Sequence, residues 1–305
     1  MKIKTVAVLG AGAVGSYVIW GLSNRKDIRL GVIAEGERAE RMKKGCIING
    51  ITYHPEVWTP QEAKGTDLLL VALKYGALPG ALESIRTITG EHTTVMSLMN
   101  GVDSEEIIAK EIGAAHILHA LIKVASHKEG NGYCFNPETT IGIIFGELTA
   151  PYQSERVQAI EDLFADTGLH YRATEYIKEE MWCKFRLNVG NNLPQAVLGA
   201  GVGCYRDSTH MKEISNKLRE ELEAIAAAKV VAANIDEYLG YHHEISCDVE
   251  IPKASLHDRV PCGRAELTER EACERVCDFE GVENCMTEKE AKQEACRCLR
   301  CDHFG

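Results

Sequence analysis

The sequence predicts an α/β protein in which a doubly wound parallel sheet is followed by an all-helical part. Short apolar runs alternate with stretches of helical periodicity in the first half of the chain, and the pattern then becomes helical. Such alternation predicts a parallel sheet that helices cover on both faces. We expect three regions: residues 1–172, a helical domain over 173–258, and a cysteine-rich tail over 259–305.

The expected elements follow one another in close order. Strands are assigned to short apolar runs, and helices to longer stretches with apolar residues at helical spacing. Residues 220–229 are especially rich in strong helix formers. Strands are expected at 6–9, 28–34, 67–73, 94–98, 117–124, 140–145 and 169–172, and helices at 13–22, 78–88, 154–166, 177–199 and 211–233.

Composition indicates an ordinary soluble protein of 305 residues, with 45% hydrophobic and 26% charged residues. The first residues run directly into a strand and lack a signal peptide's cleavage site, which favours the cytoplasm. A net charge of −11 argues against binding to nucleic acid or to a membrane surface. An anionic ligand would need a local cationic pocket. A homodimer remains an open alternative to a monomer.

The cysteines are unevenly distributed. Seven of the twelve lie between Cys262 and Cys301, while the others are scattered and read as reduced packing residues. Clustered thiolates could bind zinc or an iron–sulfur cluster, but the spacing follows no regular motif and idle thiols explain it equally well. No metal ligand is therefore assigned.

A glycine-rich turn follows the first expected strand and precedes the first expected helix. It reads Gly10-Ala-Gly-Ala-Val-Gly15, the spacing of a dinucleotide fingerprint. In that motif the glycines let the backbone approach a pyrophosphate, which the helix N-terminus binds. The predicted cofactor-binding residues of a Rossmann domain are accordingly Gly10, Gly12, Ala13, Val14 and Gly15.

The end of the second strand bears on the choice between NAD and NADP. An acid at this place binds the ribose hydroxyls, whereas a base accepts a 2′-phosphate. Here Glu35 favours NAD, while Arg38, Arg41 and Lys43 could neutralise the phosphate of NADP. Charge alone leaves the choice open.

Two polar residues follow later strands. Lys74 ends the strand at 67–73, and Asn100 follows the strand at 94–98. Because ligands collect at the carboxyl edge of a parallel sheet, both are candidate site residues.

A stripe of polar residues marks the helical part. Lys184, Asn188 and Asn192 stand four apart, so a helix would place one cation and two amides on one face. Apolar neighbours flank this face, which predicts a site for a small carboxylate rather than a solvated surface.

These residues together resemble the ketopantoate reductase (2-dehydropantoate 2-reductase) family. The resemblance rests on the glycine turn, on Lys74, on Asn100-Gly101 and on the segment from Trp182 to Asn192, and it covers about residues 1–235. It implies NADP(H) as cofactor, with NAD(H) left open by Glu35 at the place of the family's arginine. The implied reaction reduces 2-dehydropantoate to (R)-pantoate in pantothenate and coenzyme A biosynthesis.

The resemblance also implies residue roles. Lys184 would be the general acid, and hydride addition to a keto carbon does build charge that a cation stabilises. Lys74 and Asn100 would line the nicotinamide and substrate side, with Asn100 grouped among the catalytic residues. The implied substrate-binding residues are Asn188, Asn192 and, within Gly263-Arg-Ala-Glu266, Glu266.

The last residues resemble another kind of protein. Glu294-Ala-Cys-Arg-Cys-Leu-Arg-Cys301 is similar to the end of FAD-dependent iron–sulfur oxidoreductases of the glutamate synthase small-subunit type. Two alternatives to the proposed reaction therefore stay open. One is a reductase of another branched 2-keto acid, and the other is a non-catalytic nucleotide-binding redox module with a metal-binding tail.

Overall fold

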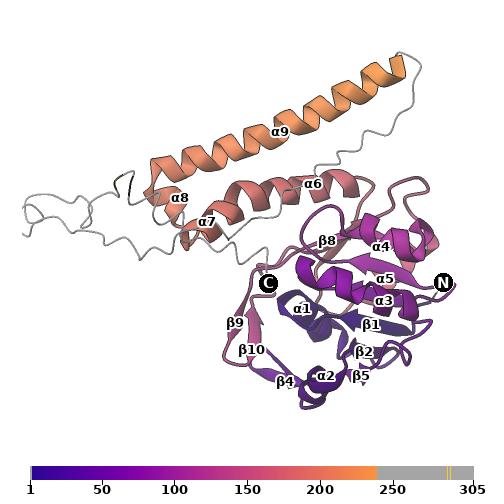
Figure 1. Ribbon diagram of the computed structural model, residues 1–305. Coiled ribbons are helices and arrows are strands. Elements are labelled where there is room, and N and C mark those ends of the chain that lie inside the picture. The colour runs from indigo at the N-terminus through magenta and orange to yellow at the C-terminus, as the bar shows by residue number, and fades with distance from the viewer. Residues whose placement is uncertain (1, 239–286, 288, 290–305) are drawn as a thin grey trace, which may run out of the picture. The chain divides into compact units, whose positions relative to one another are not determined.

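The computed structural model describes residues 2–238, 287 and 289. The chain divides into two units, Met1–Ile235 and Asp236–Gly305, and all named strands and helices α1 to α8 belong to the first (Figure 1). Glu266 and the cysteines from Cys247 onward lie outside the described residues. The three-region division at residues 172 and 258 therefore stays a prediction.

A five-stranded parallel sheet forms the centre of the first unit, in the order β5-β2-β1-β6-β7. All five strands are short. Four of them are almost fully buried, as expected for strands covered on both faces, whereas the edge strand β5 is only partly buried. In register, Val8 of β1 pairs with Val32 of β2 and Leu70 of β6. The strands are β1 (Thr5–Leu9), β2 (Arg29–Ile33), β5 (Glu56–Trp58), β6 (Leu68–Val71) and β7 (Thr94–Ser97).

Helices cover both faces of this sheet, which confirms the predicted doubly wound architecture. Val6 and Val8 face one core, which they share with α1 (Ala13–Leu22) and α5 (Glu155–Phe164). Ala7 and Leu9 face a second core, shared with α3 (Leu78–Ile88) and α4 (Ser104–Ile112). This division follows from the period of two of a β-strand.

A second sheet continues from the edge strand β7. The residues before β8 bridge to β7 through Ile117 and Val95. The sheet has the order β12-β11-β8, with β8 (His119–Lys123), β11 (Gly142–Gly146) and β12 (Tyr171–Ala173). Here the structure departs from an all-parallel sheet, because β8 and β11 are antiparallel. Only two short strands separate them in sequence, so no crossover helix carries the chain back.

A third sheet was not predicted from the sequence. Its order is β4-β3-β10-β9, and it consists of β3 (Cys46–Ile48), β4 (Ile51–Tyr53), β9 (Ser126–Glu129) and β10 (Gly132–Phe135). Strands this short, with exposed polar residues, carry little periodicity. The ring of Phe135 packs edge-on against Tyr17 of α1, with ring centroids 5.1 Å apart, and this fixes the β9–β10 hairpin to the first core.

Three further short helices link the strands. Helix α2 (Gly36–Lys43) follows β2, and the 3-10 helix η1 (Tyr75–Ala77) follows β6. A second 3-10 helix, η2 (Ala114–His116), precedes β8. Both α2 and η1 thus begin close to the carboxyl edge of the parallel sheet.

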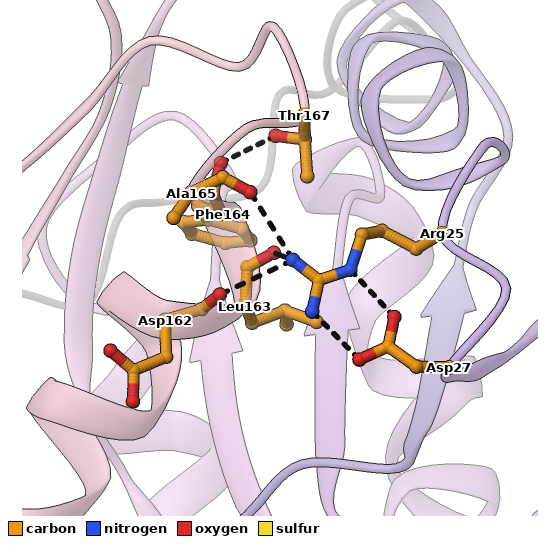
Figure 2. Close-up of polar contacts among 7 residues, drawn as sticks. All are labelled: Arg25, Asp27, Asp162, Leu163, Phe164, Ala165 and Thr167. Carbon is orange, nitrogen blue, oxygen red and sulfur yellow. Dashed lines mark hydrogen bonds and ion pairs between the residues drawn. The ribbon is translucent and has the colours of Figure 1, made fainter.

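Arg25, in the turn between α1 and β2, caps the C-terminal end of α5 (Figure 2). Its Nη1 donates to the carbonyl oxygens of Asp162, Leu163 and Ala165 at 3.2–3.3 Å. Asp27 accepts from Nε and Nη2 at 2.8 and 2.9 Å. The cation therefore satisfies carbonyls that the helix itself leaves without partners.

The helical part starts with α6 (Ile177–Leu187), which packs on the second sheet. Ile177 and Met181 bury their side chains against Leu121 of β8 and Ile144 of β11. The chain continues through the π-helix η3 (Asn188–Asn192), α7 (Leu193–Leu198), α8 (Cys204–Asp207) and α9 (Thr209–Tyr238). Within residues 2–238, every helix is too short or too polar to span a bilayer.

The predicted helix over 177–199 is thus interrupted by the wider turn of η3. Pro194 explains the interruption, because it has no N–H to donate to the carbonyl of Gly190 and its ring crowds that carbonyl. Asn191 fixes the turn from the side: its Oδ1 accepts from Ser215 of α9 at 3.2 Å and also from the guanidinium of Arg219.

Candidate functional site

The glycine turn joins β1 to α1 and has the geometry that the fingerprint requires. Gly10 has φ +105°, and a Cβ there would lie 2.6 Å from the carbonyl oxygen of Ala72. A Cβ on Gly15 would lie 1.9 Å from the carbonyl oxygen of Gly10. Neither position can therefore carry a side chain. Gly10 is required for the backbone conformation of the turn, and Gly15 is required for close packing of the helix against the strand and turn.

Gly12 is different, because a Cβ built on it would meet nothing within 4 Å. It is the N-cap of α1 and makes no side-chain cap, so the first N–H groups of the helix, from Ala13 and Val14 onward, are free to bind an anion. The open space at Gly12 is where a pyrophosphate would approach the backbone.

A cavity of about 840 Å³ opens beside this turn. Its size suits a large cofactor. It extends from the turn past the end of β2 to the β9–β10 hairpin. Its lining includes Gly10, Ala11, Gly12, Arg38, Arg41, Lys44, Cys46, Thr52, Leu73, Lys128, Asn131 and Tyr133.

The charge of this cavity is positive. Arg38, Arg41, Lys44 and Lys128 line it, and none of them forms an ion pair with a carboxylate of the described residues. Lys43 differs from these four, since its Nζ pairs with Glu40 at 2.8 Å. Glu35 is the exposed N-cap of α2 and does not line the cavity.

The residues present therefore fit a dinucleotide. Helix α1 offers free backbone N–H groups at an open glycine, and the cavity wall offers four cations. A phosphate group on the ribose would meet these cations without an opposing carboxylate from the cavity wall.

A second cavity, of about 680 Å³, lies between the loop after β7 and the helical segment α6–η3–α7. Asn100, in the loop after β7, lines it from one side, and Asn188 and Asn192 line it from the other. Tyr75 donates a 2.7 Å hydrogen bond to Asp103 at its rim. The remaining lining is mostly apolar: Gly101, Val102, Phe185, Val189, Leu193 and Ala196.

The two amides act as a pair. Asn192 Nδ2 donates to Asn188 Oδ1 at 2.9 Å. This fixes the orientation of Asn188, whose NH₂ group remains available to an acceptor. The structure thus places Asn100, Asn188 and Asn192 around one cavity.

Lys184 lies one helical turn before Asn188, and its side chain is largely withdrawn from solvent. Burial lowers the pKa of Lys184 to about 8, with a further decrease from the neighbouring cation Lys123, while the carboxylate of Glu105 opposes the shift. Lys184 is not among the lining residues of the 680 Å³ cavity, but the adjacent Phe185 is. A lysine with a pKa near neutrality can exchange a proton at physiological pH.

The two groups that act on Lys184 are themselves held in place. Lys123, at the end of β8, donates to Glu180 at 3.2 Å. Glu105, at the start of α4, is buried and accepts from Ser104 at 2.7 Å. Burial raises the pKa of Glu105 above its ordinary value. Burial is thus the main cause of the lowered pKa of Lys184, and two charges from different elements adjust it in opposite directions.

Lys74 stands apart from this group. It is the exposed N-cap of η1 and lines neither of the two cavities. The next residue, Tyr75, lines the 680 Å³ cavity instead.

Sequence reasoning missed several residues that the fold brings to these sites. Lys44, Lys128 and Tyr133 reach the nucleotide cavity from α2 and from the unpredicted third sheet. Glu105 reaches Lys184 because α4 starts beside it. The only sequence signal for Glu105 was an acid at the start of a helix, which is common for electrostatic reasons alone.

Comparisons with known proteins agree with this geometry. Residues 6–147 match the family model of ketopantoate reductase PanE/ApbA. The 2-dehydropantoate 2-reductase of Archaeoglobus fulgidus is 24% identical over 234 residues, which cover 74% of this chain and 75% of that protein.

Two solved structures show the same fold. The 2-dehydropantoate 2-reductase of Geobacter metallireducens GS-15 has a TM-score of 0.64 at 23% identity, covering 79% of this chain and 85% of its own. D-mandelate dehydrogenase, solved with NADH and anilino(oxo)acetate, has a TM-score of 0.64 at 18% identity, covering 74% of each chain. Over residues 6–147, the chain is therefore similar to the ketopantoate reductase family PanE/ApbA.

Proposed function

We propose that this protein reduces 2-dehydropantoate to (R)-pantoate with NADPH, a step of pantothenate and coenzyme A biosynthesis. The observation that carries the proposal is Lys184, withdrawn from solvent with its pKa lowered to about 8, one turn from the paired amides of Asn188 and Asn192. The proposed enzyme is cytoplasmic and acts as a monomer or as a homodimer.

The chemistry needs a proton donor beside the keto oxygen. When bound, the reduced nicotinamide supplies a hydride to the carbonyl carbon. The carbonyl oxygen then gains negative charge, which the ammonium group of Lys184 stabilises and neutralises by giving up one proton. Partial burial strengthens this interaction because less water competes for the charge.

The substrate would be held by amides and apolar groups. A carboxylate accepts hydrogen bonds, and the free NH₂ of Asn188 and the remaining N–H of Asn192 can donate them. Asn100 contributes a third amide from the opposite side of the cavity. Val102, Phe185 and Val189 provide an apolar surface for a branched carbon chain.

We assign Arg38, Arg41, Lys44 and Lys128 to the 2′-phosphate end of NADPH. Their support is the positive lining of the 840 Å³ cavity and the position of Glu35 outside that lining. The glycine turn and α1 would hold the pyrophosphate. NADH remains a usable cofactor in this proposal, because the turn and helix are common to both.

Two variants at neighbouring lysines test the cofactor assignment. Lys44→Ala removes a cavity cation, and Lys43→Ala removes its neighbour, which pairs with Glu40 instead. We expect Lys44→Ala to raise KM for NADPH about tenfold, equivalent to about 1.4 kcal/mol, with KM for NADH unchanged. Lys43→Ala should alter neither. Equal effects of Lys44→Ala on both cofactors would overturn the assignment.

A second candidate is reduction of another 2-keto acid, including one with an aromatic side chain. It is favoured by the mostly apolar 680 Å³ cavity and by the fold shared with D-mandelate dehydrogenase. The test is kcat/KM for 2-dehydropantoate, 2-oxoisovalerate and phenylglyoxylate, measured with NADPH and NADH on the full-length chain. Highest kcat/KM for phenylglyoxylate would replace 2-dehydropantoate as the proposed substrate.

A further inference from the structure

The β9–β10 hairpin has two chemically different faces. Along antiparallel strands, side chains alternate between faces, and directly paired residues share a face. Lys128 pairs with Tyr133, and both line the nucleotide cavity. His127 pairs with Cys134, one position along each strand, so these two side chains lie on the opposite face.

Glu129 joins His127 and Cys134 on this outer face. It is two residues beyond His127 on the same strand, and its Oε2 accepts a hydrogen bond from the Cys134 thiol at 2.9 Å. One nitrogen of His127, one oxygen of Glu129 and Sγ of Cys134 all lie within 4.8 Å of one another. The structure thus gathers an imidazole, a carboxylate and a thiol from two bonded strands.

We propose that His127, Glu129 and Cys134 bind a zinc ion, with water as the fourth ligand. A tetrahedral zinc site with bonds of about 2.0–2.3 Å needs neighbouring ligand atoms roughly 3.5 Å apart. The exposed side chains of His127 and Glu129 can rotate the remaining distance. Nitrogen and sulfur ligands favour zinc over magnesium or calcium, which prefer oxygen alone.

The charges balance at such a site. Binding releases the thiol proton of Cys134 to solvent, and the thiolate and the carboxylate of Glu129 together neutralise the dication. The metal thereby replaces the proton that the Cys134 thiol donates to Glu129 in its hydrogen bond. No electron is transferred.

The ion would tie β9 to β10 by side chains as well as by backbone hydrogen bonds. The same two strands present Lys128 and Tyr133 to the nucleotide cavity on the other face. Zinc would therefore fix the part of the cavity wall that the short hairpin supplies. This consequence rests on the proposed function, but metal binding itself does not.

The test is a titration of the reduced, metal-free full-length protein with Co²⁺, followed by its d–d absorption and its thiolate-to-cobalt charge-transfer band, and by competition with Zn²⁺. Since other cysteines occur in the chain, the measured quantity is the difference between variants. Cys134→Ser and His127→Ala remove ligands. Cys46→Ser is the matched control, because Cys46 is a half-buried free cysteine of the same sheet outside the cluster.

We expect wild type and Cys46→Ser to bind one more equivalent of Co²⁺ than Cys134→Ser and His127→Ala. That equivalent should show tetrahedral bands and a thiolate transition, and Zn²⁺ should displace it. Equal stoichiometry and equal spectra in wild type and in both ligand variants would overturn the proposal. Circular dichroism of each variant verifies that the fold is retained, and Glu129→Gln replaces any ligand variant that does not fold. Because activity is not measured, loss of the proposed reductase function would leave this result unaffected.

Discussion

The amide of Asn192 donates a hydrogen bond to the amide oxygen of Asn188 across 2.9 Å, within the π-helix that interrupts the α6–α7 segment. This contact orients Asn188 so that its own NH₂ group points away from its partner. Both residues line the 680 Å³ cavity. The π-helix thus presents two amides to the cavity that are hydrogen-bonded to each other and oriented by that bond.

Asn188→Asp tests whether this pair binds the substrate carboxylate. The change keeps the acceptor for Asn192 but replaces a donor by a negative charge. KM for the keto acid should rise at least about tenfold, which corresponds to about 1.4 kcal/mol, while KM for NADPH stays the same. Asn136→Asp is the control for the chemical change, since Asn136 lines neither cavity. An unchanged KM for the keto acid would remove Asn188 from the substrate site.

The pH dependence of turnover tests the surroundings of Lys184. As general acid in reduction, Lys184 must be protonated, so kcat/KM should be constant below pH 8 and fall above its pKa of about 8. Glu105→Gln removes a charge that raises this pKa, and the fall should begin at lower pH. Lys123→Met removes a charge that lowers it, and the fall should begin at higher pH.

The opposite signs of these two shifts are the informative result. General loss of stability or of packing would move both profiles in the same direction or not at all. In each variant the neighbouring contacts have substitutes: in Glu105→Gln the amide oxygen of the new side chain can still accept from Ser104, and in Lys123→Met Glu180 keeps its bond to Arg172. Identical profiles in the wild type and both variants would show that the titrating group is not Lys184.

Alanine substitutions at two glycines of the turn should have different effects, one on cofactor binding and the other on stability. A methyl group on Gly12 meets nothing in the protein itself, so Gly12→Ala should fold with an unchanged melting temperature but lose most of its NADPH affinity. A methyl group on Gly15 would lie 1.9 Å from the Gly10 carbonyl oxygen, so Gly15→Ala should unfold at lower temperature. Thermal unfolding and cofactor titration distinguish the two. Retained NADPH affinity in Gly12→Ala would place the pyrophosphate elsewhere.

Substitution of Arg25, which lines neither the 840 Å³ nor the 680 Å³ cavity, should lower the free energy of unfolding. Arg25→Ala leaves three carbonyls near the end of α5 without their cationic donor, and it should cost about 2 kcal/mol in urea unfolding. Arg86→Ala is the control, because Arg86 forms an exposed ion pair with Glu111 at 3.7 Å. That change should stay within about 0.5 kcal/mol. Equal losses in both variants would deny the capping role.

Much of the fold was predictable from local pattern. The limits of α1 and α3 matched the apolar periodicity, and the Gly10–Gly15 turn identified the strand and helix that flank it. The antiparallel β8–β11 pair and the third sheet were not predictable in this way. Their register depends on partners far along the chain, and strands of three to five residues carry too little periodicity to reveal them.

The sequence predicted several residues of the candidate site, but it did not predict how these residues contact one another. Lys184, Asn188 and Asn192 were found by spacing, but the π-turn that pairs the two amides depends on Pro194 and on the anchoring of Asn191 to α9. Lys128 came to the nucleotide cavity through tertiary structure alone. Likewise, the influence of Glu105 on Lys184 arises where α4 and α6 approach, and no local pattern encodes it.

The central claim is that Lys184 donates the proton in reduction of a keto acid. The most direct measurement is the rate of 2-dehydropantoate-dependent NADPH oxidation by Lys184→Ala, with the Kd of NADPH determined on the same preparation. We expect kcat to decrease about 10²–10⁴-fold and the Kd of NADPH to stay unchanged. A kcat close to that of the wild-type protein would contradict the central claim.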